Sequence, residues 1–303
     1  MTDEIPTEYR ILIGAIYIVT AVLMLVITVI TMAAIITCKK MRSNGTYIII
    51  FNVLLAASIQ LTDHAIGGFM GVTNGKITPW LDKVVGATSV NGWCTVNVLG
   101  LALALNRLAV FTNLPFIRQL HSMEATIVMI AVSWLCGLYF LIVLCTPNAS
   151  FIFFLEYVEW DYADLPLHGL MTQSERVIIV PAFALSFVLY VIICAKIFLM
   201  KKSASSKTAQ SSREMRLLFL SIATFVDETL LFSIYQFGSM VLPDSPYSFV
   251  AANYHWILEC GFHAIALLCI NSVIRERILE VVKKQSWLKK KTSVVSVTIH
   301  SNA

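Results

Sequence analysis

The sequence predicts an all-α membrane protein: a bundle of seven transmembrane helices, with the N-terminus outside and a short amphipathic helix on the inner surface after the last span. Three observations predict this fold. Hydrophobic residues make up 58% of the 303 residues and charged residues only 13%, whereas charged residues are about a quarter of an ordinary soluble domain. Seven apolar stretches are long enough to cross a bilayer. Basic residues are distributed unevenly between the two sides of the predicted membrane.

The seven apolar stretches each reach the roughly 20 residues that a helix needs to cross the hydrocarbon core. Their connections are short, which favours one bundle over several domains. We expect an extracellular N-terminus at 1–10, a seven-helix bundle at 11–272, and a cytoplasmic amphipathic helix and tail at 273–303, where Ile274, Ile278, Val281 and Val282 recur at helical spacing beside basic residues. The spans cover about 11–37, 46–71, 84–112, 125–146, 177–200, 216–241 and 249–272.

The Lys and Arg residues predict the orientation of the bundle. With the N-terminus outside, most of the 22 basic residues lie in cytoplasmic segments and helix ends, which is the positive-inside pattern. The net charge of +4 therefore reflects topology and attraction to anionic lipid, and we expect a lipid bilayer and no nucleic acid as a partner. The basic residues left outside are Arg10, Lys76, Lys83 and Arg176.

One outer loop, residues 147–176, is far longer than a turn between two antiparallel helices needs to be, and it is rich in aromatic and acidic residues. Such a loop in a compact bundle is often a lid or a binding loop, and a disordered insert is the alternative. It begins with the glycosylation sequence Asn148-Ala149-Ser150, which we expect to be modified; Asn44-Gly45-Thr46 would lie in the cytoplasm and stay unmodified. All seven cysteines lie in or at the ends of spans, so no extracellular disulfide framework is expected.

Several ionisable residues lie well inside the spans, where a charged group facing lipid would cost roughly 2.5 to 3.5 kcal/mol. We therefore expect an inward-facing polar network of Asp63, His64, Asp227, Glu228 and His263. His255, Glu259 and His263 recur every four residues on one helical face. Steps of four resemble the spacing of metal ligands, but polar linings are commoner in bundles, and the sequence alone assigns no metal.

The outer halves of the third, fifth, sixth and seventh spans supply the walls of a predicted ligand pocket. Aromatic walls with a few polar groups suit a small, mostly apolar ligand, although ordinary helix packing is the alternative for each residue. The seventh span contains no lysine, which excludes a retinal Schiff base, and no cofactor is expected. The predicted pocket residues are Asn91, Cys94, Phe183, Tyr235, Gln236, His255 and Glu259.

Arg107 lies about one turn from the cytoplasmic end of the third span, next to Asn106. Trp134 follows in the fourth span, Pro115 lies in the second inner loop, and the seventh span ends in Asn271-Ser272-Val273-Ile274-Arg275. These features resemble G-protein-coupled receptors. Leu105-Asn106-Arg107, Gly86, Trp93 and "GFHAIALLCINSVIR" at 261–275 resemble more closely the nematode serpentine chemoreceptors of class T, with class X a near alternative.

Two departures from rhodopsin-like receptors accompany this resemblance. Asn271 is kept at the end of the seventh span but the usual proline and tyrosine are lost, and Ala57 stands where an acidic residue of the second span would be expected. Both point to a divergent branch.

The resemblance implies a chemosensory receptor that binds a small chemical cue in the outer half of the bundle and activates a heterotrimeric G protein. It implies that Arg107 faces the G-protein cavity, with Asn106, Pro115 and Asn271 also in the coupling region; the alternative is an Arg107 that extends to the lipid phosphates. The expected location is the plasma membrane of sensory neurons or their cilia. Whether the receptor works alone or as an oligomer stays open.

Two other classes of protein are weighed against the receptor. A membrane transporter or channel would use the intramembrane Asp, Glu and His residues, but related halves or midplane helix breaks are expected for a transporter, and no convincing repeat is seen. An intramembrane enzyme is the weakest alternative because neither His-Glu-x-x-His nor Gly-x-Ser-x-Gly occurs in the sequence, so no enzymatic activity is expected.

Overall fold

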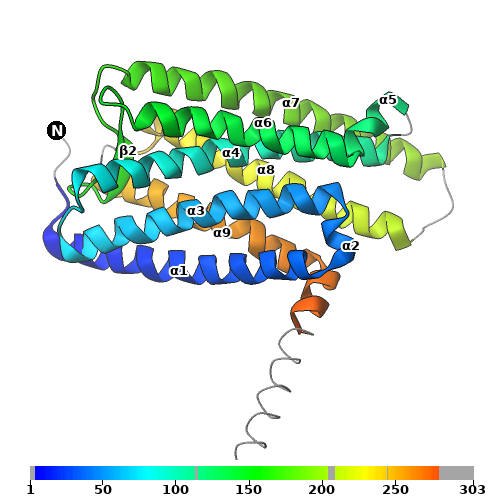
Figure 1. Cartoon of the computed structure of the whole chain (residues 1–303), viewed down its shortest axis with the longest axis horizontal. Coiled ribbons are helices and arrows are strands. Elements are labelled where there is room, and N and C mark those ends of the chain that lie inside the picture. The colour runs from blue at the N-terminus through cyan, green and yellow to red at the C-terminus, as the bar shows by residue number, and fades with distance from the viewer. Residues whose placement is uncertain (1–3, 113–114, 204–208, 244, 280–303) are drawn as a thin grey trace, which may run out of the picture.

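A computed structural model describes residues 4–112, 115–203, 209–243 and 245–279 of the chain. The long helices lie side by side, and a small β-hairpin lies at the end of the bundle at which the described chain begins (Figure 1). In chain order the elements are α1 (Thr7–Thr37), α2 (Lys39–Arg42), α3 (Gly45–Thr73), α4 (Pro79–Phe111), α5 (Pro115–Arg118), the 3-10 turn η1 (Gln119–His121), α6 (Met123–Leu144), β1 (Phe151–Phe154), β2 (Glu159–Tyr162), α7 (His168–Ser203), α8 (Ala209–Val241) and α9 (Pro246–Ile270).

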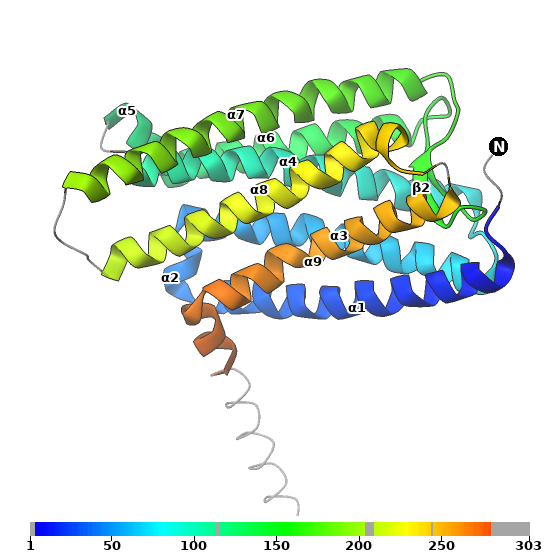
Figure 2. The same ribbon diagram turned by 180° about the vertical axis from the view of Figure 1, so that it is seen from behind.

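Seven of these helices form the predicted transmembrane bundle. Helices α1, α3, α4, α6, α7 and α8 are each long and apolar enough to cross a membrane. Helix α9 reaches that apolarity only together with the short helix Ser272–Leu279, from which it is bent by 90°. The short helix turns away from the bundle at the end opposite the hairpin (Figure 2). The all-α fold with a C-terminal helix is confirmed; Val281 and Val282 lie outside the described residues.

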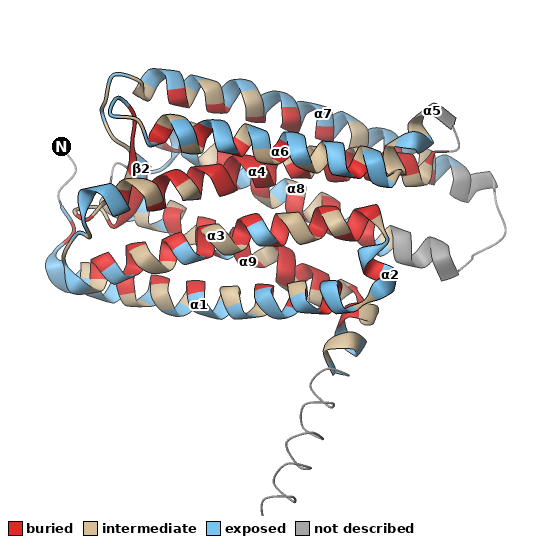
Figure 3. Ribbon diagram, viewed as in Figure 1, coloured by how far each residue is buried: buried red, intermediate tan, exposed pale blue. Residues whose placement is uncertain are grey.

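Burial places α4 at the centre of the bundle. In its most apolar stretch 67% of residues are buried, against 22% for α6 and 28% for α1. Figure 3 shows the same contrast along the ribbons. Large apolar side chains such as Val19 and Leu135 are exposed, as expected for helix faces that contact lipid rather than water.

Helices α1 and α3 approach each other closely along a glycine seam, formed by Gly14, Gly68 and Gly71. A Cβ atom built on Gly14 would lie 2.6 Å from the carbonyl oxygen of Gly68, and one on Gly68 would lie 2.7 Å from that of Gly14. Small residues of this kind let membrane helices pack backbone against backbone. The seam therefore holds the first two spans together without large side chains.

The long outer loop is an ordered antiparallel hairpin, with Phe151 opposite Tyr162 and Phe154 opposite Glu159. Its side chains Phe153 and Trp160 are fully buried. The Phe153 amide donates to Asp82 Oδ1 of α4 at 3.1 Å. A Cβ atom on Gly86 would lie only 1.8 Å from the Phe151 carbonyl oxygen, so α4 must carry glycine there. The hairpin is packed into the bundle rather than lying over it.

Helix α7 begins at His168, several residues before the predicted start of the fifth span at 177. The loop is correspondingly shorter than predicted, because residues 168–176 belong to a helix that extends beyond the apolar stretch. This extension brings polar side chains of α7 next to the hairpin.

Candidate functional site

A cavity of about 160 Å³ lies between the hairpin and the ends of four helices, and we call it the outer cavity. The predicted orientation places it on the extracellular side. Side chains of α4, the hairpin, α7, α8 and α9 line it: Val90, Trp93, Phe151, Asp161, Tyr162, His168, Thr172, Glu175, Arg176, Tyr235, Gln236 and Trp256.

Trp256 of α9 is the centre of an aromatic group in this cavity. The centroid of its ring lies 5.6 Å from the ring centroids of Trp93 and of Tyr235, and 6.3 Å from that of Phe151, and all three pairs are edge-to-face. Its indole nitrogen donates to Gln60 Oε1 at 2.8 Å, which fixes the ring orientation. Aromatic rings in this geometry are rigid and attract apolar and aromatic ligands.

Polar groups from the long α7 complete the cavity wall. Glu175 accepts hydrogen bonds from Trp93 Nε1 at 2.8 Å and from the Tyr162 hydroxyl at 3.4 Å. The neighbouring Arg176 donates from Nε to Gln236 Oε1 at 2.6 Å, which links α7 to α8. A few hydrogen-bonding groups within an apolar wall are what orients a ligand in a small-molecule site.

The hairpin contributes two acidic residues whose pKa values are shifted. Burial raises the pKa of Glu159 to about 8, and the negative charge of Asp161 acts in the same direction. Burial also raises the pKa of Asp161, although the Tyr162 amide and His168 favour its ionised form. Asp161 lines the outer cavity, so the charge of the cavity depends on pH.

Two of the seven predicted pocket residues, Tyr235 and Gln236, line the outer cavity. Asn91 lies against α6, where a Cβ atom on Gly137 would come within 2.6 Å of its Oδ1 atom. Cys94 lies in the apolar core. Phe183 packs against Phe225 and Phe232. His255 and Glu259 bind other ionisable residues instead.

The predicted polar network consists of separate groups. Thr88 donates to Asp63 at 3.2 Å, while His64 is fully buried and its ring lies edge-on to Trp256, with a centroid distance of 4.8 Å. Asp227 pairs with His255 at 3.1 Å. The remaining network residues, Glu228 and His263, form a third group with Glu259, which was predicted as a pocket residue.

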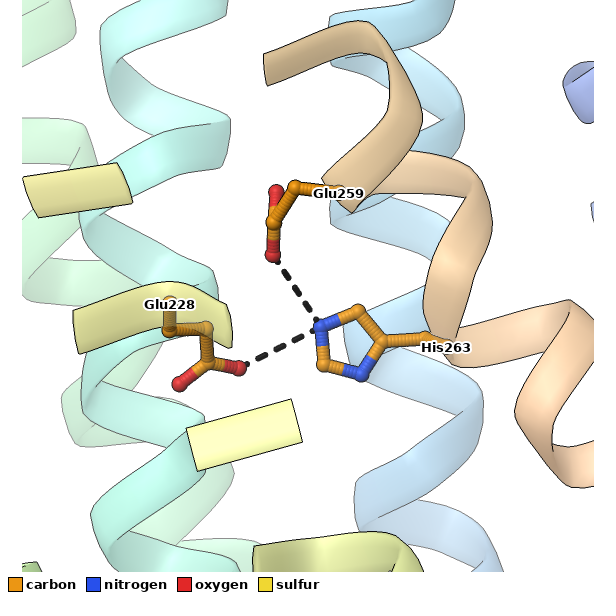
Figure 4. Close-up of side chains that lie close together, drawn as sticks. All are labelled: Glu228, Glu259 and His263. Carbon is orange, nitrogen blue, oxygen red and sulfur yellow. Dashed lines mark hydrogen bonds and ion pairs between the residues drawn. The ribbon is translucent and has the colours of Figure 1, made fainter. Parts of the chain in front are cut away.

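This third group converges on one imidazole nitrogen (Figure 4). The Nε2 atom of His263 lies 3.2 Å from Glu228 Oε1 and 3.3 Å from Glu259 Oε1. All three side chains are more than nine-tenths buried. The His255–Glu259–His263 stripe is therefore divided: its outer member pairs with Asp227, and its two inner members meet Glu228 of α8.

At the opposite end of the bundle, Arg107 is fully buried. Its Nη2 atom donates to Thr46 Oγ1 of α3 and, at 3.1 Å, to Asn106 Oδ1. Asn106 also contacts His121 Nδ1 at 3.1 Å, and Pro115 begins the short helix α5. A guanidinium directed at α3 disfavours a membrane-anchoring role, which would need an exposed side chain.

Trp134 and Asn271, which carry the receptor resemblance together with Arg107, connect helices at this end of the bundle. The indole nitrogen of Trp134 donates to Asn52 Oδ1 of α3 at 3.0 Å. Asn271 donates to the Tyr47 hydroxyl at 2.6 Å, and its Oδ1 atom accepts from the amide of Val273. Asn271 therefore caps the short C-terminal helix and ties it to α3.

Sequence reasoning did not assign Phe151, Glu175 or Trp256 to the pocket. Glu175 was placed in the outer loop because the apolar part of the fifth span begins only at 177. The signal that could have found Trp256 is its place directly after His255, on the outer half of the seventh span. Phe151 gives no such signal, because it reaches the cavity only through the fold of the hairpin.

A family model described as serpentine type 7TM GPCR chemoreceptor Srt matches residues 2–291. No curated protein sequence matches the chain. Among solved structures, the crystal structure of squid rhodopsin matches with a TM-score of 0.77 and 15% sequence identity, over 93% of this chain and 87% of that one. At this identity the structural match concerns the fold alone, whereas the family match extends over nearly the whole chain.

Proposed function

Because the chain belongs to the Srt family of serpentine seven-transmembrane chemoreceptors, we propose that it binds a small chemical cue in the outer cavity and activates a heterotrimeric G protein from the opposite end of the bundle. Membership of this family agrees with the class T resemblance in the sequence, and a receptor role follows from it. The location of the ligand, the coupling residues and a plasma-membrane site in sensory neurons or their cilia are parts of the proposal.

The outer cavity is the observation that carries this proposal. It combines an aromatic wall around Trp256 with the hydrogen-bonding groups of Glu175 and Gln236. A volume of about 160 Å³ favours a small ligand, and the aromatic wall favours one with a substantial apolar part. Because α7, α8 and α9 all contribute to the wall, a ligand there contacts several spans at once.

The other end of the bundle has a closed arrangement. Arg107 is hydrogen-bonded to α3, and an apolar cluster joins α4, α7 and α8 through residues that include Leu108, Ile193 and Leu218. In the proposed function, ligand binding favours a conformation in which this cluster opens and Arg107 becomes accessible to a G protein. A ligand shifts such an equilibrium only by its difference in affinity for the two conformations.

The ligand part of the proposal is tested by a screen of volatile and small soluble compounds in cells that report calcium or cyclic nucleotide. Tyr235→Ala removes one aromatic wall of the cavity and should lower the potency of any agonist found at least about tenfold. Tyr9→Ala, at an exposed position in the first turn of α1 at the same end of the bundle, is the control and should leave the potency unchanged. If the Tyr235 variant kept the wild-type potency, the ligand would have to bind elsewhere.

The coupling part is tested by Arg107→Ala at matched surface expression. We expect agonist binding to be kept and agonist-stimulated nucleotide exchange to fall sharply, because the proposed contact with the G protein is lost. Arg118→Ala removes an exposed arginine of α5 at the same end and is the matched control. Full signalling by the Arg107 variant would show that Arg107 does not couple the receptor to a G protein. Agonist-dependent substrate flux without nucleotide exchange would instead favour a transporter.

A further inference from the structure

We propose that Glu228, Glu259 and His263 form a binding site for a divalent transition-metal ion, with zinc as the best match, which joins α8 to α9 inside the bundle. Glu259 and His263 lie four residues apart on one face of α9, and Glu228 faces them from α8 (Figure 4). The receptor function does not require this site, and the site does not require the receptor function.

The two distances from the imidazole nitrogen to the carboxylate oxygens match zinc coordination. The donor atoms of the three side chains all lie within 4.8 Å of one another, and the two nitrogen-to-oxygen distances are 3.2 and 3.3 Å. Zinc bonds of about 2.0–2.1 Å in a tetrahedral site put neighbouring ligand atoms about 3.3 Å apart. In the proposed site an ion replaces the shared proton on Nε2.

Charge balance also favours a cation. Two ionised carboxylates beside one imidazolium carry a net charge of −1, and an unbalanced charge in a buried site is costly. The group becomes neutral either when one carboxyl group is protonated or when two carboxylates and a neutral imidazole hold a divalent ion. All three side chains are buried, so solvent cannot supply this compensation.

Helix α4 leaves room for the carboxylate at this point. A Cβ atom on Gly100 would lie only 3.0 Å from Glu228 Oε2. A side chain at position 100 would therefore press on the carboxylate, and glycine allows Glu228 to extend between α8 and α9. Gly100 thus offers a variant that disturbs the site without removing a ligand.

The donor set indicates which metal is suitable. One imidazole nitrogen with two carboxylate oxygens suits zinc and its neighbours in the first transition row, whereas Ca²⁺ and Mg²⁺ favour oxygen-only sites with more ligands. Three protein ligands leave a fourth position open for water.

The outer cavity and the proposed metal site lie close together along α9. Glu259 lies three residues after Trp256, about 4.5 Å along the axis of α9. His255 lies one turn further out on the same face of α9 and pairs with Asp227 of α8, and these two side chains are 23% and 24% exposed.

The test uses the full-length receptor in lipid nanodiscs, freed of metal with a chelator and then titrated with Co²⁺ and Zn²⁺. We expect about one equivalent of bound metal, visible absorption bands of coordinated Co²⁺, and their loss on addition of Zn²⁺. Glu228→Gln and Glu259→Gln should each weaken binding at least about tenfold. Asp227→Asn, which removes the adjacent carboxylate of α8, is the matched control and should keep the affinity within about twofold.

Gly100→Ala serves where a glutamine variant fails to fold, since it keeps every ligand and should still weaken binding. Absence of metal binding in the wild type would overturn the proposal and leave the group as an imidazole that shares its proton with two carboxylates. Equal affinity in the wild type and in all ligand variants would overturn it as well, because the metal would then bind elsewhere.

Discussion

Gly86 determines how closely the hairpin approaches α4. Gly86→Ala places a Cβ atom 1.8 Å from the Phe151 carbonyl oxygen, and because both sides of this contact are backbone, the hairpin must move. We expect a loss of about 1–3 kcal/mol in stability, as for other overpacked sites, and weaker agonist binding. Thermal unfolding of the purified receptor measures the first effect and ligand titration the second.

Gly169→Ala is the control for this substitution. Gly169 lies in the first turn of α7, and no atom lies within 4 Å of the position of its Cβ atom. Its alanine variant should unfold at or slightly above the wild-type temperature. A Gly86 variant with wild-type stability would show that the hairpin is not held in the packed position.

Asn271 has two separable roles at the junction of α9 and the short helix. Asn271→Ala removes both the cap on Val273 and the hydrogen bond to Tyr47, so we expect a loss of about 1–3 kcal/mol. Tyr47→Phe removes only the hydrogen bond and should have the smaller effect. Thermal unfolding of the two variants separates the contributions, and equal losses would contradict the capping role.

The contribution of the hairpin to the stability of the protein should depend on pH. The folded-state pKa of Glu159 is about 8, above the ordinary glutamate value, so the folded state holds a proton that the unfolded chain releases. The unfolding free energy should therefore fall as pH rises from about 4.5 to about 8, by up to about 1.4 kcal/mol per pH unit. The raised pKa of Asp161 acts in the same direction.

Thermal unfolding at pH 6 and pH 8.5 measures this dependence. Glu159→Gln should reduce the difference between the two temperatures, since glutamine has no proton to lose. Glu156→Gln, in the turn of the same hairpin, should leave the difference unchanged. A pH dependence that is identical in the wild type and the Glu159 variant would assign it to other groups.

Among the secondary-structure elements, the membrane-spanning helices could be predicted from the sequence, whereas the hairpin could not. A span is a local property, because about 20 apolar residues in a row are enough to identify it. Each hairpin strand has only four residues, too few for a clear alternation, and the hairpin depends on contacts such as Gly86 with Phe151 that join distant parts of the chain. The predicted start of α7 was late for a related reason, since its first turns are polar.

The candidate site was predictable only where one helix face defined it. The stripe of His255, Glu259 and His263 follows from helical spacing. Its division between Asp227 and Glu228 does not, because that depends on how α8 is rotated against α9. Tyr235 and Gln236 were assigned from their depth alone, while Trp256 and Glu175 needed the packed structure to be placed in the same cavity.

For the whole molecule, glycosylation tests the predicted orientation. Asn148 is exposed at the hairpin end of the bundle. Asn44 lies at the other end, and Thr46 of its sequence is buried against Asn106. Asn148→Gln should abolish a glycosidase-sensitive shift in electrophoretic mobility, and Asn44→Gln should leave that shift unchanged. If only the Asn44 variant lost the shift, the orientation of the protein in the membrane would be the opposite of the predicted one.

The glycine seam between α1 and α3 has a consequence for biosynthesis. These two spans are the first to leave the ribosome, and their backbones pack closely against each other. Their contact needs no residue from later in the chain, so they can associate as soon as both have entered the bilayer, while the remaining spans are still being translated. The central helix α4 then arrives at a surface that has already formed.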